Sequence, residues 1–147
     1  VYIILKLNKM NMKILKGTAF GGIAYFLLGW LIYGILLIDF TATSFNQCAA
    51  RPDGLMIWWA MILASFILAL FLTLVLKWSG TKGIVDGIKT GALFGILFGL
   101  STDLSNYSMS TMFNNLTALI VDVVVWAFIL AIVGLIIVLT WGKDKAI

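Results

Sequence analysis

Residues 82–107, KGIVDGIKTGALFGILFGLSTDLSNY, decide how this chain folds. Glycine recurs here at every fourth residue, and the same step then reaches Asp103 and Tyr107. The glycines are Gly83, Gly87, Gly91, Gly95 and Gly99. Positions four apart lie nearly above one another on a helix, so these glycines form one stripe. Because such a stripe lets another helix backbone approach closely in lipid, we interpret it as a helix-packing surface.

The composition is that of an integral membrane protein. Of the 147 residues, 63% are hydrophobic and 11% are charged, whereas soluble domains are about half apolar and a quarter charged. The long apolar runs lack the two-residue alternation of a membrane β-barrel. At about 20 residues per spanning helix, the sequence predicts an all-α membrane protein. Its domain, residues 17–147, should hold four transmembrane helices, near residues 18–38, 55–76, 84–105 and 116–140.

The residue types that most enzymes and metal sites need are scarce. The chain has no histidine and a single cysteine, Cys48, and its acidic residues are all aspartates. This excludes histidine-dependent nucleophilic catalysis and most metal-ligand sets, and a single thiol excludes an intrachain disulfide. We therefore expect no cofactor, no metal centre and no enzymatic activity.

Residues 1–16 form a basic segment with four lysines and no acidic residue. We expect this segment to lie in the cytoplasm ahead of the first helix, and Met10 or Met12 is a possible natural start of the protein. The apolar run that follows is longer than the hydrophobic region of a signal peptide, and no small-residue cleavage site comes after it. We therefore interpret this run as a retained helix.

Lysine and arginine are distributed unevenly between the helices. Four precede the first helix, Arg51 lies alone in the first loop, three lie around the second loop, and two follow the last helix. Because positive residues accumulate in cytoplasmic loops, both termini and the middle loop are predicted to face the cytoplasm of a bacterial inner membrane. This basic side should contact anionic lipid headgroups, and we expect no nucleic-acid partner.

The two halves of the chain show a weak internal repeat. Gly17 and Gly21 of the first helix align with Gly91 and Gly95 of the third, and Gly29 continues the four-residue step of the first helix. A duplicated two-helix hairpin would have a pseudo-two-fold axis along the membrane normal. We predict that the two glycine stripes face each other within one chain. The alternative is that one stripe serves a homo-oligomer.

Short motifs add a resemblance to a known family. They are GWLIY at residues 29–33 and VDVVVW at residues 121–126, together with the four-helix plan and the glycine-rich third helix. With these, the chain resembles a family of small bacterial membrane proteins that carries only a domain-of-unknown-function label and is commonest in Bacteroidota-type bacteria. The likeness covers roughly residues 17–141. It implies a four-helix fold and no particular activity.

Two aspartates, Asp103 and Asp122, are predicted to lie inside the membrane. At 1.5 Å per residue they should lie roughly 10 Å and 9 Å below the outer face, and therefore at one level. An ionisable residue inside a span is a functional candidate, and two adjacent carboxyls could share a proton or bind a small cation. The alternative is a structural polar network near the interface. Polar residues expected near the pair are Tyr33, Ser105, Asn106 and Tyr107.

Two functions fit these features. The first is helix association, as a homo-oligomer or as an accessory subunit of a larger membrane complex, and the glycine stripes and minimal loops favour it. The second is a carrier of a small solute, an ion or a proton that uses Asp103 and Asp122. The carrier would also require an oligomer, because a single chain of four helices has few helices with which to enclose a pathway for a solute.

Overall fold

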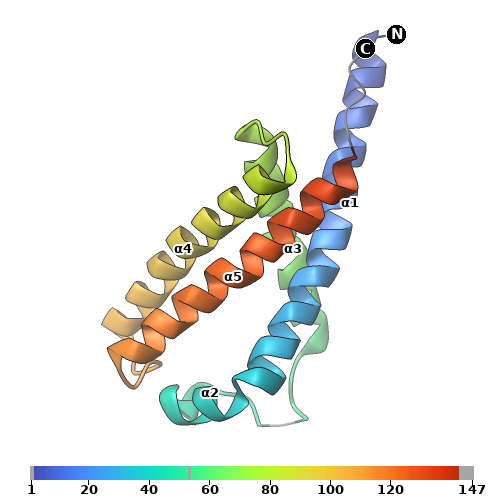
Figure 1. Ribbon diagram of the computed structural model, residues 1–147. Helices are drawn as coiled ribbons and strands as arrows, with labels where there is room; N and C mark the ends of the chain where they lie inside the picture. The colour runs from blue at the N-terminus through green and yellow to red at the C-terminus, as the bar shows by residue number, and fades with distance from the viewer. Residues whose placement is uncertain (1, 53, 143–147) are drawn as a thin grey trace.

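The structure, a computed structural model, consists of four long helices joined by short connections (Figure 1). It describes residues 2–52 and 54–142, without the side chains of residues 2–10 and 49. A π-helical turn (Ile32–Leu36), a short helix α2 (Ile38–Ser44) and a 3₁₀ turn (Gln47–Ala49) separate the first two long helices. The long helices are α1 (Tyr2–Leu31), α3 (Trp58–Trp78), α4 (Ile84–Met109) and α5 (Leu116–Trp141).

Four segments are long and apolar enough to span a membrane, and this confirms the predicted fold class. The segments are Asn11–Leu36, Trp58–Trp78, Ile84–Met109 and Leu116–Trp141. The predicted ends lie within a few residues of these, except at the start of the first helix and at the end of α4. There α4 continues to Met109, and its serine hydroxyls bond to carbonyls of the preceding turn, as Ser105 does to Ser101 at 2.8 Å.

The basic N-terminal segment is part of α1, contrary to the expectation that it precedes the first helix. The helix begins at Tyr2 and passes through the lysine-bearing residues without a break. The segment before Gly17 contains no proline or glycine and is rich in leucine, lysine and methionine, which favour helix. At this end the Trp141 indole N–H donates to the Lys13 carbonyl at 3.0 Å, so the last turn of α5 lies against α1.

The predicted first loop also contains a helix. Residues Ile38–Ser44 form α2, with Asp39 in its first turn, where a carboxylate interacts favourably with the helix dipole. After α2, the Leu55 N–H donates to the Pro52 carbonyl at 3.1 Å. Gly54 has a φ of 85°, which glycine adopts without strain.

Helix α5 is the centre of the bundle. It packs most extensively against α4 and also against α1, while α1 pairs with α3. The residues with no exposed surface come from α3 and α5; they are Leu72, Thr73, Leu76, Ala118, Leu130, Val133 and Ile137. In contrast, α3 and α4 make little contact.

The prediction that the two glycine stripes face each other is wrong. The α4 stripe packs against α5, where a Cβ at Gly91 would clash with the Leu130 carbonyl oxygen and one at Gly95 would lie 2.6 Å from the carbonyl oxygen of Trp126. The α1 glycines instead meet α3 and α5, and α1 makes almost no contact with α4. The reason is surface fit, because the backbone of α5 at Leu130, Ala131 and Gly134 lies directly against the α4 glycines.

Only the middle of the predicted α4 stripe is buried. Gly87, Gly91, Gly95, Gly99 and Asp103 are buried, whereas a Cβ at Gly83 would meet nothing within 4 Å. A residue advances about 100° around an α-helix, so each four-residue step overshoots a full turn by about 40° and a strict four-residue stripe winds around the helix. In α1, Gly29 likewise has no atom near an added Cβ, so Gly29 and Gly83 are not helix-packing residues within this chain.

The internal repeat is only partly visible in the packing. Gly17 lies beside Thr73 of α3, and its aligned residue Gly91 lies beside Leu130 of α5, so each meets the second helix of its own hairpin. A two-fold relation would also make the α3–α4 contact equal the α1–α5 contact, yet only the second is extensive. The duplication therefore stays a prediction.

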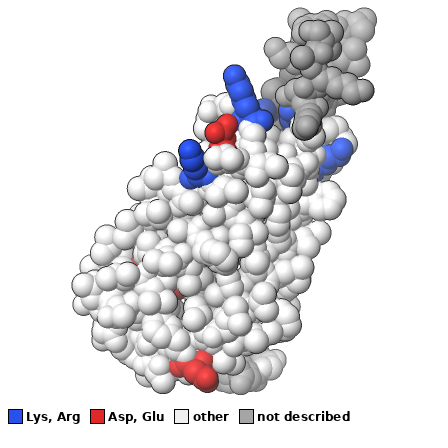
Figure 2. Space-filling view, viewed as in Figure 1, with Lys and Arg blue, Asp and Glu red and all other residues white. Residues whose placement is uncertain are grey.

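Charged side chains gather at the two ends of the molecule and leave an uncharged band between them (Figure 2). Lysine side chains, with acidic atoms beside them, lie at the end that holds the start of α4, and acidic atoms also lie at the opposite end. The single arginine, Arg51, lies in the connection between α2 and α3. The surface of the band is rich in exposed large hydrophobic side chains from all four long helices. The distribution fits four spans with the basic connections at one end, as the lysine count predicts.

Candidate functional site

The buried aspartates of the two hairpin helices come together near one end of the bundle. Asp103 lies on the face of α4 that packs against α5 and is 3% exposed, and Asp122 of α5 is 6% exposed. Asp103 is six residues before the end of α4 at Met109, and Asp122 is six residues after the start of α5 at Leu116. Both therefore lie about 9 Å from their helix ends, at one level as predicted.

The two carboxyl groups are within side-chain hydrogen-bonding distance of each other. Carboxylates only accept hydrogen bonds, so a bond between them requires a proton on one of the two. The alternative bridge is a cation. This contact is the central feature of the site, because two charges of the same sign at this separation repel strongly in an apolar surrounding.

Asp122 has more hydrogen-bond donors than Asp103. The Tyr33 hydroxyl donates to its Oδ1 at 2.5 Å, and the Trp126 indole N–H donates to its Oδ2 at 3.2 Å. Both oxygens therefore have a donor, and hydrogen bonds to a charged acceptor are the strong ones. Tyr33 comes from α1's π-helical turn and Trp126 from α5, so this carboxyl links the two hairpins.

Asp103 has fewer partners. Its Oδ1 accepts only a long hydrogen bond, 3.4 Å, from the neighbouring Thr102 hydroxyl. Its Oδ2 is buried and has no hydrogen-bond partner within the described residues. A buried oxygen without a partner is costly, so this atom is where a proton or a small cation would complete the site.

A π-helical turn places Tyr33 against the pair. The Leu37 N–H bonds to the Ile32 carbonyl at 2.7 Å, five residues back, so the turn Ile32–Leu36 is wider than an α-helical one. Single π turns inside α-helices occur frequently at functional sites. The sequence contains no signal that predicted this turn.

The groups described around the two carboxyls include no basic side chain. Those that act on them are Tyr33, Trp126, Thr102 and the other carboxyl of the pair. Nor do three or more His, Cys, Asp or Glu side chains come together anywhere in the described part of the chain. Charge compensation by lysine or arginine is thus not what holds the pair.

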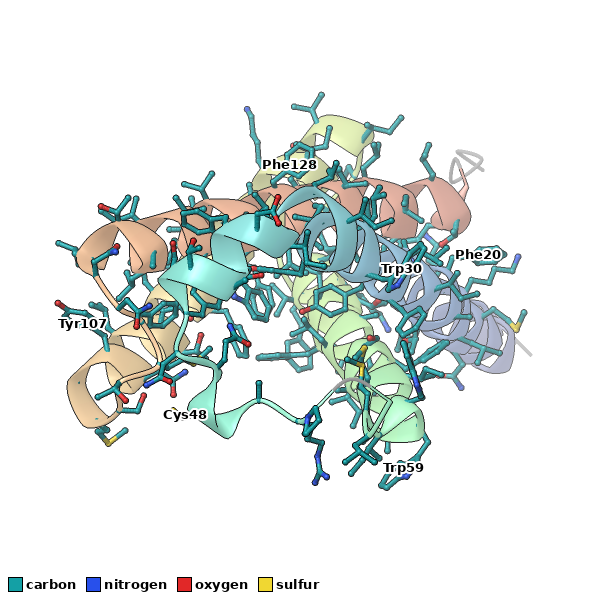
Figure 3. The ribbon with its side chains drawn as sticks, turned by 90° about the horizontal axis from the view of Figure 1, so that it is seen from below. Phe20, Trp30, Cys48, Trp59, Tyr107 and Phe128 are labelled. Carbon is teal, nitrogen blue, oxygen red and sulfur yellow. The ribbon has the colours of Figure 1, made fainter. Side chains whose placement is uncertain are left out.

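Three of the predicted site residues meet, and three do not. Asp103, Asp122 and Tyr33 form the site, whereas Ser105 is exposed and Tyr107 is 45% exposed. Figure 3 shows Tyr107 at the outer edge of α4, directed away from the other helices. The side chain of Asn106 is half-buried, with no hydrogen bond to the pair described. The winding of the four-residue stripe explains why Tyr107 leaves the face that carries Asp103.

Trp126 is a site residue that the sequence did not single out. It lies one turn after Asp122 on α5, and residues four apart on a helix can interact. Its ring also packs against Tyr25, with centroids 6.1 Å apart, and against Phe98 at 5.4 Å. The four-residue spacing between Asp122 and Trp126 is visible in the sequence, but an apolar span contains many residue pairs with this spacing.

A cap covers the end of the bundle nearest the aspartate pair. We define the cap as Phe40 of α2, Phe45 and Phe113, which pack ring against ring, with 5.1 Å between the Phe45 and Phe113 centroids. The Asn114 N–H donates to the Ser44 carbonyl at 3.0 Å, and this joins the two loops.

The cap sits directly on the helix that carries Asp122. Phe113 packs in one cluster with Leu119 and Val123, which lie on either side of Asp122 in the sequence. The two loops are further joined by the Asn46 N–H, which donates to the Met112 carbonyl at 2.8 Å. Apolar rings therefore cover the α5 residues next to Asp122 at this end of the molecule.

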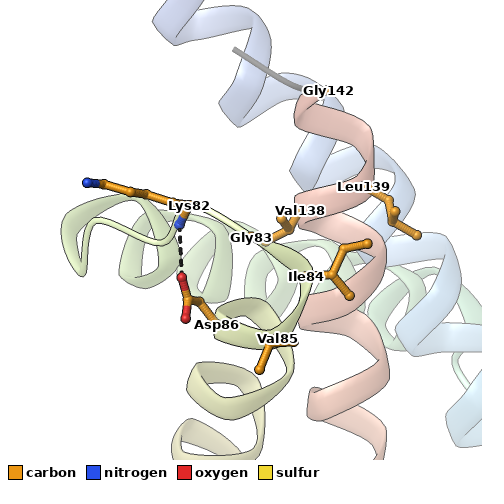
Figure 4. A pocket seen from close by; sticks show the side chains of 8 residues that line it. All are labelled: Lys82, Gly83, Ile84, Val85, Asp86, Val138, Leu139 and Gly142. Atoms are coloured by element: carbon orange, nitrogen blue, oxygen red, sulfur yellow. Dashed lines mark hydrogen bonds between the residues drawn. The ribbon is translucent and has the colours of Figure 1, made fainter. Parts of the chain in front are cut away.

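A hollow at the lysine-rich end is a weaker candidate. It has a volume of about 460 Å³ and lies between the start of α4 and the end of α5 (Figure 4). Its polar groups are those of Lys82, which points away from the helices, and Asp86, whose carboxylate accepts from the Lys82 N–H at 3.4 Å. Gly142 at its edge adjoins the part of the chain that is not described, so we assign no site there.

Comparison with known proteins gives no match: no family model, no curated protein and no solved structure matches the chain. The resemblance to a small bacterial family of unknown function therefore stays a prediction. The function of the aspartate pair has to follow from its own geometry.

Proposed function

We propose that this protein is a carrier, rather than an enzyme, in a bacterial inner membrane. It couples movement of a small solute or ion to a proton that binds and leaves at the Asp103–Asp122 pair. The observation that carries the proposal is the buried contact between the two carboxyls, with Asp103 Oδ2 left without a partner. This part of the chain is inside the predicted spans.

Electrostatics require a proton or a cation at the pair. Two unit charges about 4 Å apart repel by about 4 kcal/mol at an effective dielectric constant of 20. A single proton or monovalent cation between the carboxyls removes most of this repulsion. The donors from Tyr33 and Trp126 favour Asp122 as the anion, so Asp103 is the carboxyl that takes the proton.

The cap supplies a barrier that a carrier needs. Phe40, Phe45 and Phe113 pack over the start of α5, beside the residues that flank Asp122, and we propose that they close the route from this end to the pair. By the distribution of lysine and arginine this end faces outward. For the pair to exchange a proton with the outside, the rings have to separate, and the loops of both hairpins move together because hydrogen bonds join them.

Uptake by proteoliposomes tests the proposal. Vesicles holding the purified protein are given a metabolite extract, with or without an imposed proton gradient, and the accumulated solutes are identified by mass spectrometry. We expect at least one solute to accumulate only with the gradient. The double variant Asp103→Asn/Asp122→Asn should lose this uptake.

Asp86→Asn is the matched control, because Asp86 is an exposed aspartate on the same helix as Asp103. It should leave uptake unchanged. The proposal fails if the wild type shows no gradient-dependent uptake, or if the double variant accumulates the same solutes to the same level.

Association with a second copy or with another membrane subunit is the second candidate. It is supported by the uneven bundle, in which α3 and α4 make little contact and leave broad apolar faces exposed. Anionic lipids are the expected partners of the basic end. A mass measurement of the native complex extracted in detergent tests this candidate, and a complex holding a single copy and no other protein would contradict it.

A further inference from the structure

A cavity of about 500 Å³ lies between the end of α1 and the start of α3, next to Tyr33 of the aspartate site. This volume is within the range of about 300–1,000 Å³ that is usual for small-molecule sites. The cavity is open to the surface of the apolar band, where its lining residues Trp30 and Trp58 are half exposed. Its walls are largely aromatic, and the described residues that line it include no lysine or arginine. The aromatic residues are Tyr25, Phe26, Trp30, Tyr33 and Trp58.

Two glycines of the first span that pack against no other helix border this cavity. Nothing lies within 4 Å of a Cβ placed at Gly29, and only the Trp30 ring approaches one placed at Gly34. Both glycines line the cavity. Gly29 therefore forms part of the cavity surface, which explains why this member of the α1 stripe contacts no other helix.

Two tyrosines that line the cavity contact the Asp122 carboxylate, Tyr33 directly and Tyr25 through Trp126. Tyr33 lines the cavity and donates its hydroxyl hydrogen to Asp122 at 2.5 Å. Tyr25, another wall, packs against Trp126, whose indole N–H donates to the second oxygen of the same carboxyl. A ligand in the cavity is thus separated from the Asp122 carboxylate by a single layer of side chains.

We propose that this cavity binds a lipophilic organic cation, of the quaternary ammonium or phosphonium class, as the substrate of the carrier proposed above. Aromatic rings attract cations through their faces, and arrangements of several rings recognise quaternary ammonium groups. The negative charge behind Tyr33 adds a long-range attraction that a neutral ligand of the same shape does not feel. Besides its five aromatic residues, the lining has the apolar side chains of Ile38, Met56 and Met61. It therefore suits a cation that carries its charge within apolar groups.

Cation binding and proton binding at the pair should oppose each other. The titratable groups near the cavity are Tyr25 and Tyr33 of the first span, Asp103 of α4 and Asp122 of α5, while Asp39 of α2 is exposed. When the pair holds a proton it has lost one negative charge. Binding of a cation therefore favours release of that proton, which is the exchange a proton-coupled carrier performs.

The test compares two ligands with the same three phenyl rings, methyltriphenylphosphonium and the neutral triphenylphosphine oxide. Binding to the full-length protein in detergent is measured by calorimetry, with protein-free micelles subtracted. We expect the phosphonium to bind more tightly than the phosphine oxide and to release protons into a weakly buffered solution. Equal binding of the two ligands would overturn the inference and show an apolar groove instead.

Matched variants locate the site. Trp30→Ala removes a cavity wall and should weaken phosphonium binding roughly 2- to 30-fold. Trp59→Ala removes an exposed tryptophan that does not line the cavity and should have no effect. Gly29→Leu fills the cavity where no packing atom is displaced, so it should abolish binding while thermal stability is retained. Unchanged phosphonium binding in Gly29→Leu would overturn the inference.

The proposed substrate class and the proposed carrier function can fail independently of each other. If wild-type vesicles show uptake that needs the proton gradient and the two aspartates, but the phosphonium binds no better than the phosphine oxide, only the substrate class is wrong. If the phosphonium binds and Gly29→Leu abolishes its binding, but no solute follows the proton gradient, the cavity is a cation site and the carrier proposal fails.

Discussion

A carboxyl group inside an apolar bundle is stable only when donors or a counter-charge replace the water it has lost. In this protein the donors are shared unequally. Tyr33 and Trp126 serve both oxygens of Asp122, while Asp103 Oδ2 is buried without a partner. The two aspartates are therefore expected to respond differently to the same substitution.

Asparagine should be tolerated at Asp103 and should destabilise the protein at Asp122. An amide at position 103 supplies an N–H that can donate to Asp122, whereas an amide at position 122 has one oxygen for two donors, Tyr33 and Trp126. We expect Asp103→Asn to be nearly neutral and Asp122→Asn to lower the free energy of unfolding by about 1–3 kcal/mol. Unfolding in mixed detergent micelles measures both. The reverse order would contradict the donor assignment.

Tyr33 should stabilise the fold through its hydroxyl. Tyr33→Phe removes a hydrogen bond to a charged acceptor and should cost about 1.5–3 kcal/mol. Tyr107→Phe is the control, because Tyr107 is 45% exposed and surface changes stay within about 0.5 kcal/mol. Equal unfolding curves for the two variants would mean that the bond to Asp122 contributes nothing.

The sequence predicts some of these residues better than others. An aspartate in an apolar span stands out by composition, so Asp103 and Asp122 were identifiable, and the glycine stripe correctly places Asp103 on a helix contact face. Tyr33 and Trp126 are harder, since both also suit an apolar span. Nothing in the sequence predicts a π-helical turn at Ile32–Leu36, yet this turn places the Tyr33 hydroxyl against Asp122.

At the scale of the helices, small residues determine which pair meets. The α4 stripe is matched on α5 by Ala127, Ala131 and Gly134, whose backbone atoms lie against the α4 glycines. The prediction paired the α4 stripe with the α1 glycines, with a homo-oligomer as the alternative, and this alanine-containing stripe of α5 was not considered. Surface fit favours α5, because small residues on both helices let the two backbones approach closely, and that is why α4 meets α5 rather than α1.

An alanine in the α4 stripe should separate α4 from α5. The added Cβ at Gly95 would lie 2.6 Å from a backbone oxygen and that at Gly91 would clash with another, and the backbone cannot move aside as a side chain can. Overpacking costs about 1–3 kcal/mol, so we expect Gly91→Ala and Gly95→Ala to unfold more readily than wild type.

Gly29→Ala is the control for these variants, because it lies in a helix and meets nothing within 4 Å. It should be neutral or should stabilise the protein by up to about 1 kcal/mol through helix propensity. If Gly91→Ala were as stable as Gly29→Ala in the same micelles, the α4–α5 backbone contact would not exist in solution.

For the whole molecule, hydropathy and charge determine the arrangement in the membrane. The number of spans follows from apolar length alone, and the lysine-rich connections come out at one end of the structure (Figure 2). The short α2 and the cap could not be predicted, because their contacts join residues of two distant loops, such as Phe45 and Phe113. Those contacts lie over the aspartate pair and complete the site.

Cys48 makes the predicted orientation directly measurable. It is the only cysteine of the chain, it is exposed, and it lies in the connection that follows α2, at the end opposite the lysines. Because lysine-rich connections stay in the cytoplasm, a membrane-impermeant maleimide should label Cys48 in intact cells once the outer membrane is permeabilised. In a Cys48→Ser background, Ser79→Cys places a thiol in the exposed connection between α3 and α4. That thiol should react only after the inner membrane is broken. Labelling of position 79 and protection of Cys48 in intact cells would invert the orientation, and the cap would then close the cytoplasmic side of the aspartate pair.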